Sequence, residues 1–507
     1  MNRLLAFKSH SVLPSFDLWN IQKMFQVIVF LLSAMILSWL IITFSSFQVI
    51  LVPVGVFFLY IIIRKPEIGI LAVIAIVASI IYKLDIPRIH IPGGSLLVTD
   101  VILLALLLQI PFKALADRSF RLLTTPLDFP LLLFIFAAFI SAGISIFKYR
   151  LDFKVIVGTG LQTIIYYLLF FTITNLIREK KQLRVLFGGL FGIATVVSLA
   201  MIIQARVGQS VRLMYGRIEA AEQGSWAMRI IPPGEVVIFV TFISAVCAIA
   251  IMNKPFFRTV YFYLIPILGA GLLLTYNRQY WGSIIFSLFI FMLLTSERGK
   301  RRFLSWIAIV FISVILVILP ITTLSKTIRV YSDSIIGRFS SLFTVKETLA
   351  GSSLGWRKIE NQYAWRSIVK HPFLGIGLYN TYRPPLPGMD IGKTGWDSKR
   401  FIHNGYLWVL VSMGLLGFLP LMWFYICFLV RGFSNWRKIR YPIEKSAVIG
   451  YAVSGIALSL SILVEPRIMQ WHGIVVIATI TGLNEVIIRR NEKEFHGNSL
   501  LKVENHE

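Results

Sequence analysis

Unbroken apolar runs of about twenty residues constrain the fold of this chain more than any other feature. Two clear examples are 236–252 and 303–321. An α-helix rises about 1.5 Å per residue, so about 20 residues cross the hydrocarbon core of a bilayer. Of the 507 residues, 57% are hydrophobic and only 15% are charged. Soluble domains carry about 25% charged residues, which excludes a soluble globular protein. We therefore expect an all-α polytopic membrane protein.

Hydropathy predicts about fourteen transmembrane helices. The expected spans are 25–44, 46–63, 67–82, 96–112, 127–147, 155–177, 185–204, 230–252, 259–276, 280–295, 303–322, 402–430, 446–464 and 471–488. With a cytoplasmic N-terminus, the even-numbered connections are cytoplasmic. These connections carry five basic clusters, at 64–65, 178–181, 298–302, 437–438 and 489–490. Cytoplasmic loops are enriched in Lys and Arg, so the clusters favour this orientation.

These spans divide the chain into four parts. Spans 1–11 form a transmembrane bundle at 1–322, and spans 12–14 lie at 402–490. Between them, 323–401 is one large extracytoplasmic (periplasmic) loop, far longer than ordinary connections between helices. The last part, 491–507, is a cytoplasmic tail.

Two outer segments, 205–229 and 323–401, hold an excess of positive charge. They contain sixteen of the fifty lysines and arginines but only seven acidic residues. Long translocated loops escape the rule that governs cytoplasmic charge, so their charge can report function. A basic extracytoplasmic cavity suggests an anionic ligand such as phosphate or pyrophosphate. Attraction to the anionic headgroups of membrane lipid is the alternative explanation.

The formal net charge of +26 does not indicate a nucleic-acid partner, because no basic-aromatic recognition motif interrupts the apolar runs. The two cysteines, Cys247 and Cys427, both lie inside apolar runs. No pair of carboxylates has metal-binding spacing in an outer loop. We therefore expect no metal and no cofactor.

His403 is the strongest candidate catalytic residue. It stands where the large outer loop re-enters the membrane, at a boundary between polar and apolar sequence. An imidazole can take a proton from a hydroxyl near neutral pH, so His403 is a candidate general base, and Asn404 and Tyr406 beside it are candidate substrate contacts. A structural histidine at the interface is the alternative. His371 precedes Pro372 and is expected to shape a helix-ending corner.

Arg278 is the second candidate catalytic residue. It lies in a minimal polar interruption, 276–281, between two apolar spans. An arginine in so tight an outer turn is costly unless it is paired or binds something, and its planar fork suits phosphate oxygens. An arginine that reaches to lipid headgroups from a helix end is the alternative.

Four further arginines are candidate substrate-binding residues. Arg217 and Arg229 precede the rigid Pro232-Pro233-Gly234 entry to the eighth span, and either could point into the cavity. Arg338 and Arg357 extend the basic surface of the large loop. The neighbouring aromatic residues Trp356, Tyr363 and Trp365 offer flat faces for sugar rings, although an amphipathic helix on the membrane surface explains them equally well.

Motifs of other enzyme classes are absent: there is no Gly-x-Ser-x-Gly elbow, no Walker loop and no His-Glu-x-x-His. If this protein is an enzyme, we therefore expect it to work without nucleotide hydrolysis. Transfer from a lipid-pyrophosphate-linked donor meets that condition, because the leaving group needs only cationic stabilisation.

Three motifs resemble the signature of the O-antigen ligase and Wzy polymerase superfamily. They are His-Pro-Phe-Leu-Gly-Ile-Gly at 371–377, His-Asn-Gly-Tyr-Leu at 403–407 and Gly-Leu-Leu-Gly at 414–417. The family usually has Ser-Arg-Gly where this chain has Asn277-Arg278-Gln279, so only the arginine is retained. The resemblance implies that His403 assists the acceptor hydroxyl. It also implies that Arg278, together with Arg229 or Arg217, holds the pyrophosphate of the undecaprenyl carrier.

The resemblance implies a GT-C-like fold and a metal-independent, inverting glycosyltransferase in the bacterial cytoplasmic (inner) membrane. A polymerase for O-antigen, capsule or exopolysaccharide would extend a glycan acceptor. An O-antigen ligase would instead transfer the glycan to lipid A-core. A flippase and a chain-length regulator are the expected partners. A transporter of the same lipid-linked sugars is a rival, but the expected inverted repeats are not visible in the sequence.

Overall fold

The computed structural model describes residues 46–81, 86, 88–91, 94–209, 211–214, 216–221, 227–252, 255–313, 326–340, 353–385 and 399–504. The chain divides into two compact units, Met1–Ile61 and Ile62–Glu507, and the features below belong to the second unit unless stated otherwise. The expected first span, 25–44, lies outside the described residues, as does the end of the eleventh span, 314–322.

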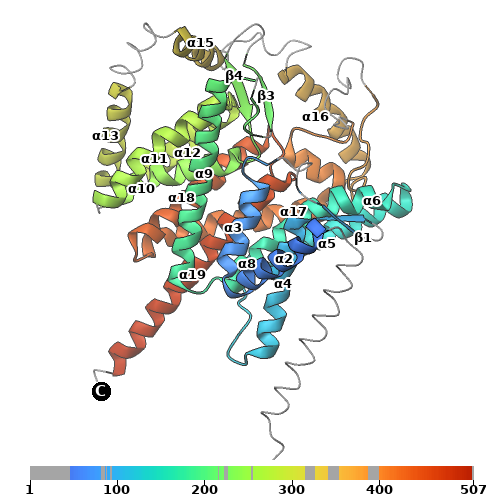
Figure 1. Cartoon of the computed structure of the whole chain (residues 1–507), viewed down its shortest axis with the longest axis horizontal. Helices are drawn as coiled ribbons and strands as arrows, with labels where there is room; N and C mark the ends of the chain where they lie inside the picture. The colour runs from blue at the N-terminus through green and yellow to red at the C-terminus, as the bar shows by residue number, and fades with distance from the viewer. Residues whose placement is uncertain are drawn as a thin grey trace, which may run out of the picture. The chain divides into compact units, whose positions relative to one another are not determined.

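Helices form where the apolar runs occur (Figure 1). The principal apolar helices are α2 Ser46–Arg64, α3 Pro66–Val77, α4 Val98–Ala116, α5 Asp128–Gly143, α9 Lys180–Val207, α10 Glu235–Ile251, α11 Pro255–Leu274, α12 Arg278–Leu294, α13 Glu297–Ser313, α17 Gly405–Asn435, α18 Pro442–Ile462 and α19 Trp471–Glu504. Seven helical segments among the described residues are long and apolar enough to cross a membrane. The predicted polytopic helical architecture is confirmed in this form.

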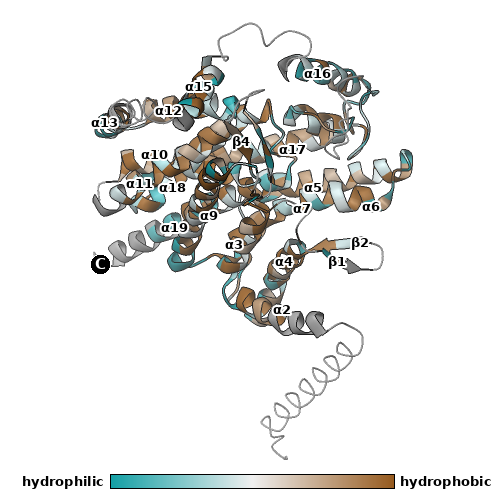
Figure 2. Cartoon of the chain, turned by 45° about the horizontal axis from the view of Figure 1, so that its top comes forward, coloured by the Kyte–Doolittle hydropathy of each residue, from teal (hydrophilic) through white to brown (hydrophobic). Residues whose placement is uncertain are grey.

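The remaining helical segments are shorter or more polar. They are η2 Ile144–Lys148, α6 Phe153–Val155, η3 Ile156–Leu161, α7 Gln162–Ile165, η4 Tyr166–Leu168, α8 Leu169–Leu176, α15 Lys326–Ser340, α16 Ser353–Lys370 and η7 Trp436–Lys438. The segments from α6 to α8 follow one another without interruption and together form one apolar crossing, Phe153–Leu176. Figure 2 shows that more of the α16 ribbon has the colour of hydrophilic residues than that of α5 or α10.

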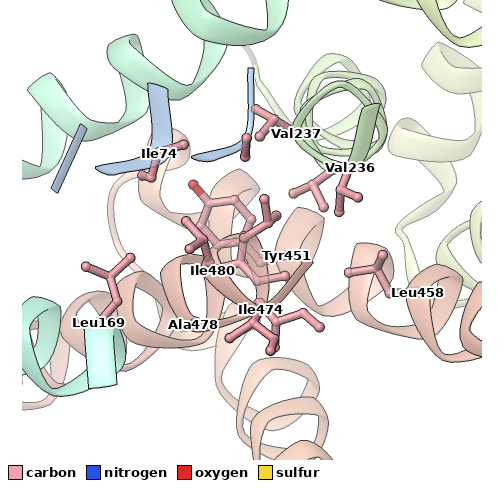
Figure 3. Close-up of a cluster of buried hydrophobic side chains, with 14 of the residues drawn as sticks. Ile74, Leu169, Val236, Val237, Tyr451, Leu458, Ile474, Ala478 and Ile480 are labelled. Atoms are coloured by element: carbon pink, nitrogen blue, oxygen red, sulfur yellow. The ribbon is translucent and has the colours of Figure 1, made fainter. Parts of the chain in front are cut away.

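The core of the second unit is built around α19. Within Trp471–Glu492, 94% of the most apolar window is buried, more than in any other candidate span of the described residues. Figure 3 shows side chains from α3, α8, α10, α18 and α19 meeting there, with the Tyr451 ring among Ile74, Val237 and Ile480. Burying aliphatic side chains on several helices at once fixes their packing.

The N-termini of four helices, α10, α12, α17 and α19, lie together around residues 463–470, and we call this part of the molecule the site end. The loop between α18 and α19, 463–470, lies there. Within this loop, Arg467 pairs with Glu235 at the start of α10, and Glu465 accepts a hydrogen bond from Gln279 in the first turn of α12. Gly405, the first residue of α17, packs against Pro466. The N-termini of α10, α12, α17 and α19 therefore surround one loop.

The basic clusters predicted for one face gather at the opposite end. Four contacts join the turns that carry them: Lys180 lies over the Tyr441 ring, Arg490 pairs with Glu444, Arg437 donates to the Leu294 carbonyl, and Gln182 donates to Glu67. Because α18 runs from this end to the site end over 21 residues, the two ends are about 30 Å apart.

Two short hairpins depart from the all-α prediction, which is wrong at these positions. Strand β1 Arg88–Ile91 pairs with β2 Gly94–Leu97, and β3 Arg217–Ala220 pairs with β4 Met228–Ile231, both antiparallel. Along β4, buried and half-buried residues alternate, which is the two-residue period of a strand. The eighth span was expected from 230, but α10 begins only at Glu235, after Pro232 and Pro233 have ended the strand.

Helix α17 is broken at Gly414, where φ is 59° and ψ is −158°. The 371–377 segment fills the break: Ile376 N donates to the Val411 carbonyl, and Leu415 N donates to the Pro372 carbonyl. A Cβ at Gly414 would lie 2.7 Å from Gly375 N, so only glycine permits this approach. The expectation that His371 stands at a helix-ending corner is confirmed, since α16 ends at Lys370. Two of the motifs therefore pair to hold the start of α17 in place.

Candidate active site

His403 lies directly before α17 and is held by a carboxylate from α16. Its Nδ1 is 2.7 Å from Glu360 Oε2, and its backbone N donates to the same oxygen over 3.3 Å. The Glu360 side chain is 4% exposed, whereas that of His403 is 37% exposed. Because an ionised carboxylate only accepts hydrogen bonds, Nδ1 carries the proton and Nε2 is left as an acceptor. The edge of the Phe401 ring packs on the imidazole.

Asn404 and Tyr406 make structural contacts beside this histidine. Asn404 caps α17: its Oδ1 accepts hydrogen bonds from Tyr406 N at 3.1 Å and Leu407 N at 3.2 Å. The Tyr406 hydroxyl donates to the Ser459 carbonyl of α18 over 2.9 Å. These bonds fix the first turn of α17 and, with it, the position of His403.

Arg229 and Arg278 lie together at the site end. Arg229, on β4, donates to Asn277 Oδ1 over 2.8 Å and to the Thr275 carbonyl over 3.1 Å. Asn277 is the residue before Arg278, which begins α12. Burial lowers the pKa of the Arg229 guanidinium, and the carboxylate of Glu219, 3.2 Å away, opposes that shift. Arg229 is thus a largely buried cation next to Arg278.

The other arginine of this segment, Arg217, occupies a different position. It lies on β3 with a side chain that is 66% exposed, and it pairs with Glu219 at 2.7 Å. Arg338 lies in the last turn of α15, next to Phe339, whose ring stacks on Trp281 of α12. Of the two alternatives left open by the sequence, the structure therefore brings Arg229, rather than Arg217, next to Arg278.

A buried cluster of charged residues packs against the turn that holds Arg229 and Arg278. Arg467 is 2% exposed and pairs with Glu235 and, at 2.7 Å, with Glu465. Although burial lowers the pKa of the Arg467 guanidinium, the two carboxylates more than compensate, and the pKa rises. Glu235 also accepts a hydrogen bond from Asn277 over 2.8 Å, which connects the cluster to Arg229.

Arg357 joins the two groups of residues. It lies on α16, three residues before Glu360. Burial lowers the pKa of its guanidinium, the carboxylates of Glu465 and Glu360 oppose this shift, and the positive charges of Arg229 and Arg278 lower the pKa further. Charges act on one another in this way only when they lie close together, so Arg357 lies near Glu360 and near Arg229 and Arg278.

One face of α16 lines an open groove of about 770 Å³. Its residues on that helix are Arg357, Lys358, Asn361, Gln362, Trp365 and Arg366. Leu407 of α17 and the loop residues Leu463 and Val464 form the other wall. We call this cavity the α16 groove.

The helix N-termini that meet at the site end also favour an anion. The backbone N–H groups of a helix's first turn and the helix dipole place positive potential there. The starts of α10, α12, α17 and α19 add this potential to that of Arg229 and Arg278. Within the described part of the chain, no group of three His, Cys, Asp or Glu side chains could hold a metal ion. The chemistry available to these residues is therefore cationic binding of an anion beside a proton acceptor.

Several residues of this site carried no signal in the sequence. In the sequence, Glu360 is only one of seven acidic residues in the two outer segments. Glu235, Glu465 and Arg467 were not singled out, although the Pro-Pro-Gly before Glu235 and the short apolar-flanked turn at 463–470 mark both positions as constrained.

Comparison with known proteins found one family match. Residues 262–422 match a protein-family model described as O-antigen ligase. The matched region contains Arg278, Glu360, His403 and the 371–377 segment that fills the break in α17. No curated protein sequence matches the chain. The resemblance seen in the motifs is confirmed over this region: residues 262–422 of this polytopic helical protein are similar to the O-antigen ligase family.

Proposed function

We propose that this protein is a polysaccharide polymerase that transfers a glycan from undecaprenyl pyrophosphate to a sugar hydroxyl at the outer face of the cytoplasmic membrane. The observation that carries the proposal is the pairing of His403 with Glu360 at 2.7 Å, at the same end of the molecule as Arg229 and Arg278. A proton acceptor at the same end of the molecule as two cations fits transfer from a pyrophosphate leaving group.

In the proposed reaction, the acceptor hydroxyl oxygen forms a bond to the anomeric carbon of the donor glycan. The bond from that carbon to the pyrophosphate oxygen breaks, and the lipid pyrophosphate departs with the electron pair. The hydroxyl proton passes to Nε2 of His403. Glu360 keeps the proton on Nδ1 and stabilises the imidazolium that forms. Attack opposite the leaving group inverts the anomeric centre.

Arg278 and Arg229 neutralise the departing pyrophosphate in this proposal, and no metal ion is needed. Arg229 is held by Asn277, Thr275 and Glu219, so its position is set before the substrate binds. A charge fixed in advance stabilises developing negative charge without reorganisation. The buried Arg467 and Glu235 pair keeps this turn in place, so its role is structural support.

The division of charge between the two ends supports the proposed orientation. The clusters at 178–181, 437–438 and 489–490 lie at the end opposite the site, which fits a cytoplasmic face for that end. The site then faces the periplasm, where a carrier would present its glycan. In the same proposal, the complete chain crosses the membrane fourteen times in a GT-C-like fold, with a flippase and a chain-length regulator as partners.

An O-antigen ligase is the second candidate, because the matched family carries that description. The donor chemistry is the same, and only the acceptor differs: a glycan for the polymerase and lipid A-core for the ligase. The polymerase and the ligase therefore differ in which acceptor molecule presents its hydroxyl to His403.

Cellular glycans separated on a gel test the proposal. The variants are His403→Ala and Arg278→Ala, each shown to be inserted in the membrane at wild-type amounts. We expect each to lose roughly two to four orders of magnitude in activity, so that cells no longer make long chains. Single-repeat material that remains attached indicates a polymerase, whereas carrier-linked polymer with bare core indicates a ligase. Wild-type long chains from inserted His403→Ala protein would exclude both.

A further inference from the structure

The α16 groove borders the pair of Arg229 and Arg278 through Arg357, but its chemistry differs. Lys358, Gln362, Trp365 and Arg366 are exposed, and the Trp365 side chain is 59% exposed. The described residues that line the groove include three cations and no carboxylate. The opposite wall is apolar. The groove thus combines exposed positive charge, amide groups and a flat aromatic face.

Two polar atoms in the groove have unmet hydrogen-bonding capacity. Among the residues that the structure describes, Arg357 Nε and Asn361 Oδ1 are buried and have no hydrogen-bond partner. One is a donor and the other an acceptor, four residues apart on the same helix face. Buried polar atoms are rarely left unpaired in proteins, so these two atoms call for a partner that both donates and accepts.

Saccharides with carboxylate groups have the matching chemistry. A sugar hydroxyl both donates and accepts, which suits Arg357 Nε and Asn361 Oδ1 once these two side chains turn toward the groove. The apolar face of a sugar ring can pack on Trp365. A carboxylate on the ring suits the cations of Lys358 and Arg366. A neutral saccharide would offer no negative charge to Lys358 and Arg366.

The groove also leads to the proposed base. Its two helical walls are the helices that meet at His403: Arg357 lies three residues before Glu360 on α16, and Leu407 lies four residues after His403 in the first turn of α17. The end of the groove at Arg357 and Leu407 is therefore within about one helical turn, or about 5 Å along each helix axis, of the paired histidine and glutamate.

We propose that the α16 groove is the acceptor subsite and that it selects a glycan bearing carboxylate groups, such as one containing uronic acid. This inference rests on the proposed function, because it names the class of acceptor for the same site. The pyrophosphate remains with Arg229 and Arg278, and the groove holds the acceptor chain so that its terminal hydroxyl reaches His403.

Binding measurements on the purified full chain in detergent test this inference without turnover. The probes are tetragalacturonic acid, neutral maltotetraose and farnesyl pyrophosphate. The groove variant is Lys358→Gln/Arg366→Gln. A matched control, Arg329→Gln/Lys370→Gln, removes two exposed cations from α15 and α16 outside the groove. A third variant, Trp365→Ala, removes the aromatic face without changing charge.

We expect wild-type protein to bind tetragalacturonic acid at least about tenfold more tightly than maltotetraose. The groove variant is expected to lose about tenfold in affinity for the acidic probe, while the control variant and farnesyl pyrophosphate binding stay unchanged. Trp365→Ala should weaken the binding of both saccharides.

Three results overturn the inference. Equal affinity for the two saccharides removes the selection for carboxylates. An equal loss in the control variant shows that only overall charge matters. Loss of farnesyl pyrophosphate binding in the groove variant assigns the groove to the donor instead. Each result is independent of polymer formation by His403→Ala cells, so a failure of the proposed function is distinguished from a failure of this inference.

Discussion

At the scale of single residues, the chemistry of the site depends on which nitrogen of His403 is protonated. Glu360 settles this through the 2.7 Å contact to Nδ1, and its own burial keeps water from competing for that bond. In the proposed reaction, Nε2 then accepts the proton of the acceptor hydroxyl. Glu360 therefore acts through His403 and is a positioning residue.

Replacing the carboxylate tests this role. Glu360→Gln keeps the shape and a hydrogen-bond acceptor but cannot stabilise the imidazolium, so we predict that kcat falls about a hundredfold while KM for the acceptor changes little. Steady-state kinetics on reconstituted protein give both values. Asp333→Asn, an exposed acid on α15, serves as the control and should retain wild-type rates. A wild-type kcat for Glu360→Gln would remove Glu360 from the mechanism.

The buried Arg467 cluster leads to a prediction about stability. Arg467→Gln leaves Glu235, which is 1% exposed, without its charged partner. Breaking a buried ion pair by removing one partner costs about 3–5 kcal/mol. We predict a markedly lower thermal midpoint for this variant, with partial recovery in Arg467→Gln/Glu235→Gln. Surface substitution Arg329→Gln is the control, and an unchanged midpoint for Arg467→Gln would contradict the packing described here.

The sequence indicates His403 and Arg278 as candidate site residues but does not indicate which side chains contact the histidine or form the buried ion pairs. His403 and Arg278 stand at boundaries between polar and apolar sequence, which marks them. Glu360 precedes His403 by 43 positions, and Glu235 precedes Arg467 by 232. A single sequence does not record which distant residues meet, so these pairs required the three-dimensional structure.

At the scale of secondary structure, the break in α17 positions the site. The segment 371–377 occupies the gap at Gly414 and replaces the missing helical hydrogen bonds with its own backbone groups. Unsatisfied backbone groups are costly within a membrane, so a broken helix persists only where another segment pairs with it. The motif glycines thus act through close backbone packing.

Alanine at Gly414 should disrupt this packing. The positive φ and the 2.7 Å approach of a Cβ to Gly375 N both disfavour a side chain, so we predict a loss of about 1–3 kcal/mol in stability. The thermal midpoint of the solubilised protein measures this. Gly192→Ala on α9 is matched, because its Cβ meets nothing within 4 Å, and should be neutral or stabilising. Equal behaviour of the two variants would refute the steric account.

Elements were predicted unevenly from the sequence. Long apolar runs determine the helices, and their bounds agree with expectation to within a few residues for α5 and α18. The hairpins were missed because four-residue strands such as β3 and β4 give too few periods to register, and 230–231 was assigned to a span because it is apolar.

At the scale of the whole molecule, the account requires the site end to face outward. Positive charge occurs at both ends for different reasons: at one end it surrounds helix termini as an anchor, and at the other it lies beside His403 and in the α16 groove. The orientation of the chain in the membrane determines which of these two basic ends faces the periplasm.

Cysteine labelling in intact cells tests that orientation. In a protein with Cys247 and Cys427 replaced by serine, Gln362→Cys in the groove should react with a membrane-impermeant maleimide added outside. Lys300→Cys, at the start of α13, should react only after the cells are permeabilised. The reverse pattern would invert the topology and place the site in the cytoplasm.

The most direct test of the central claim is the acceptor-dependent release of undecaprenyl pyrophosphate from its glycan by purified protein in proteoliposomes. With chelator added, we predict release by wild-type protein only when the acceptor is present, and a rate at least about a hundredfold lower for folded His403→Ala protein. Release by folded His403→Ala at the wild-type rate would contradict the account.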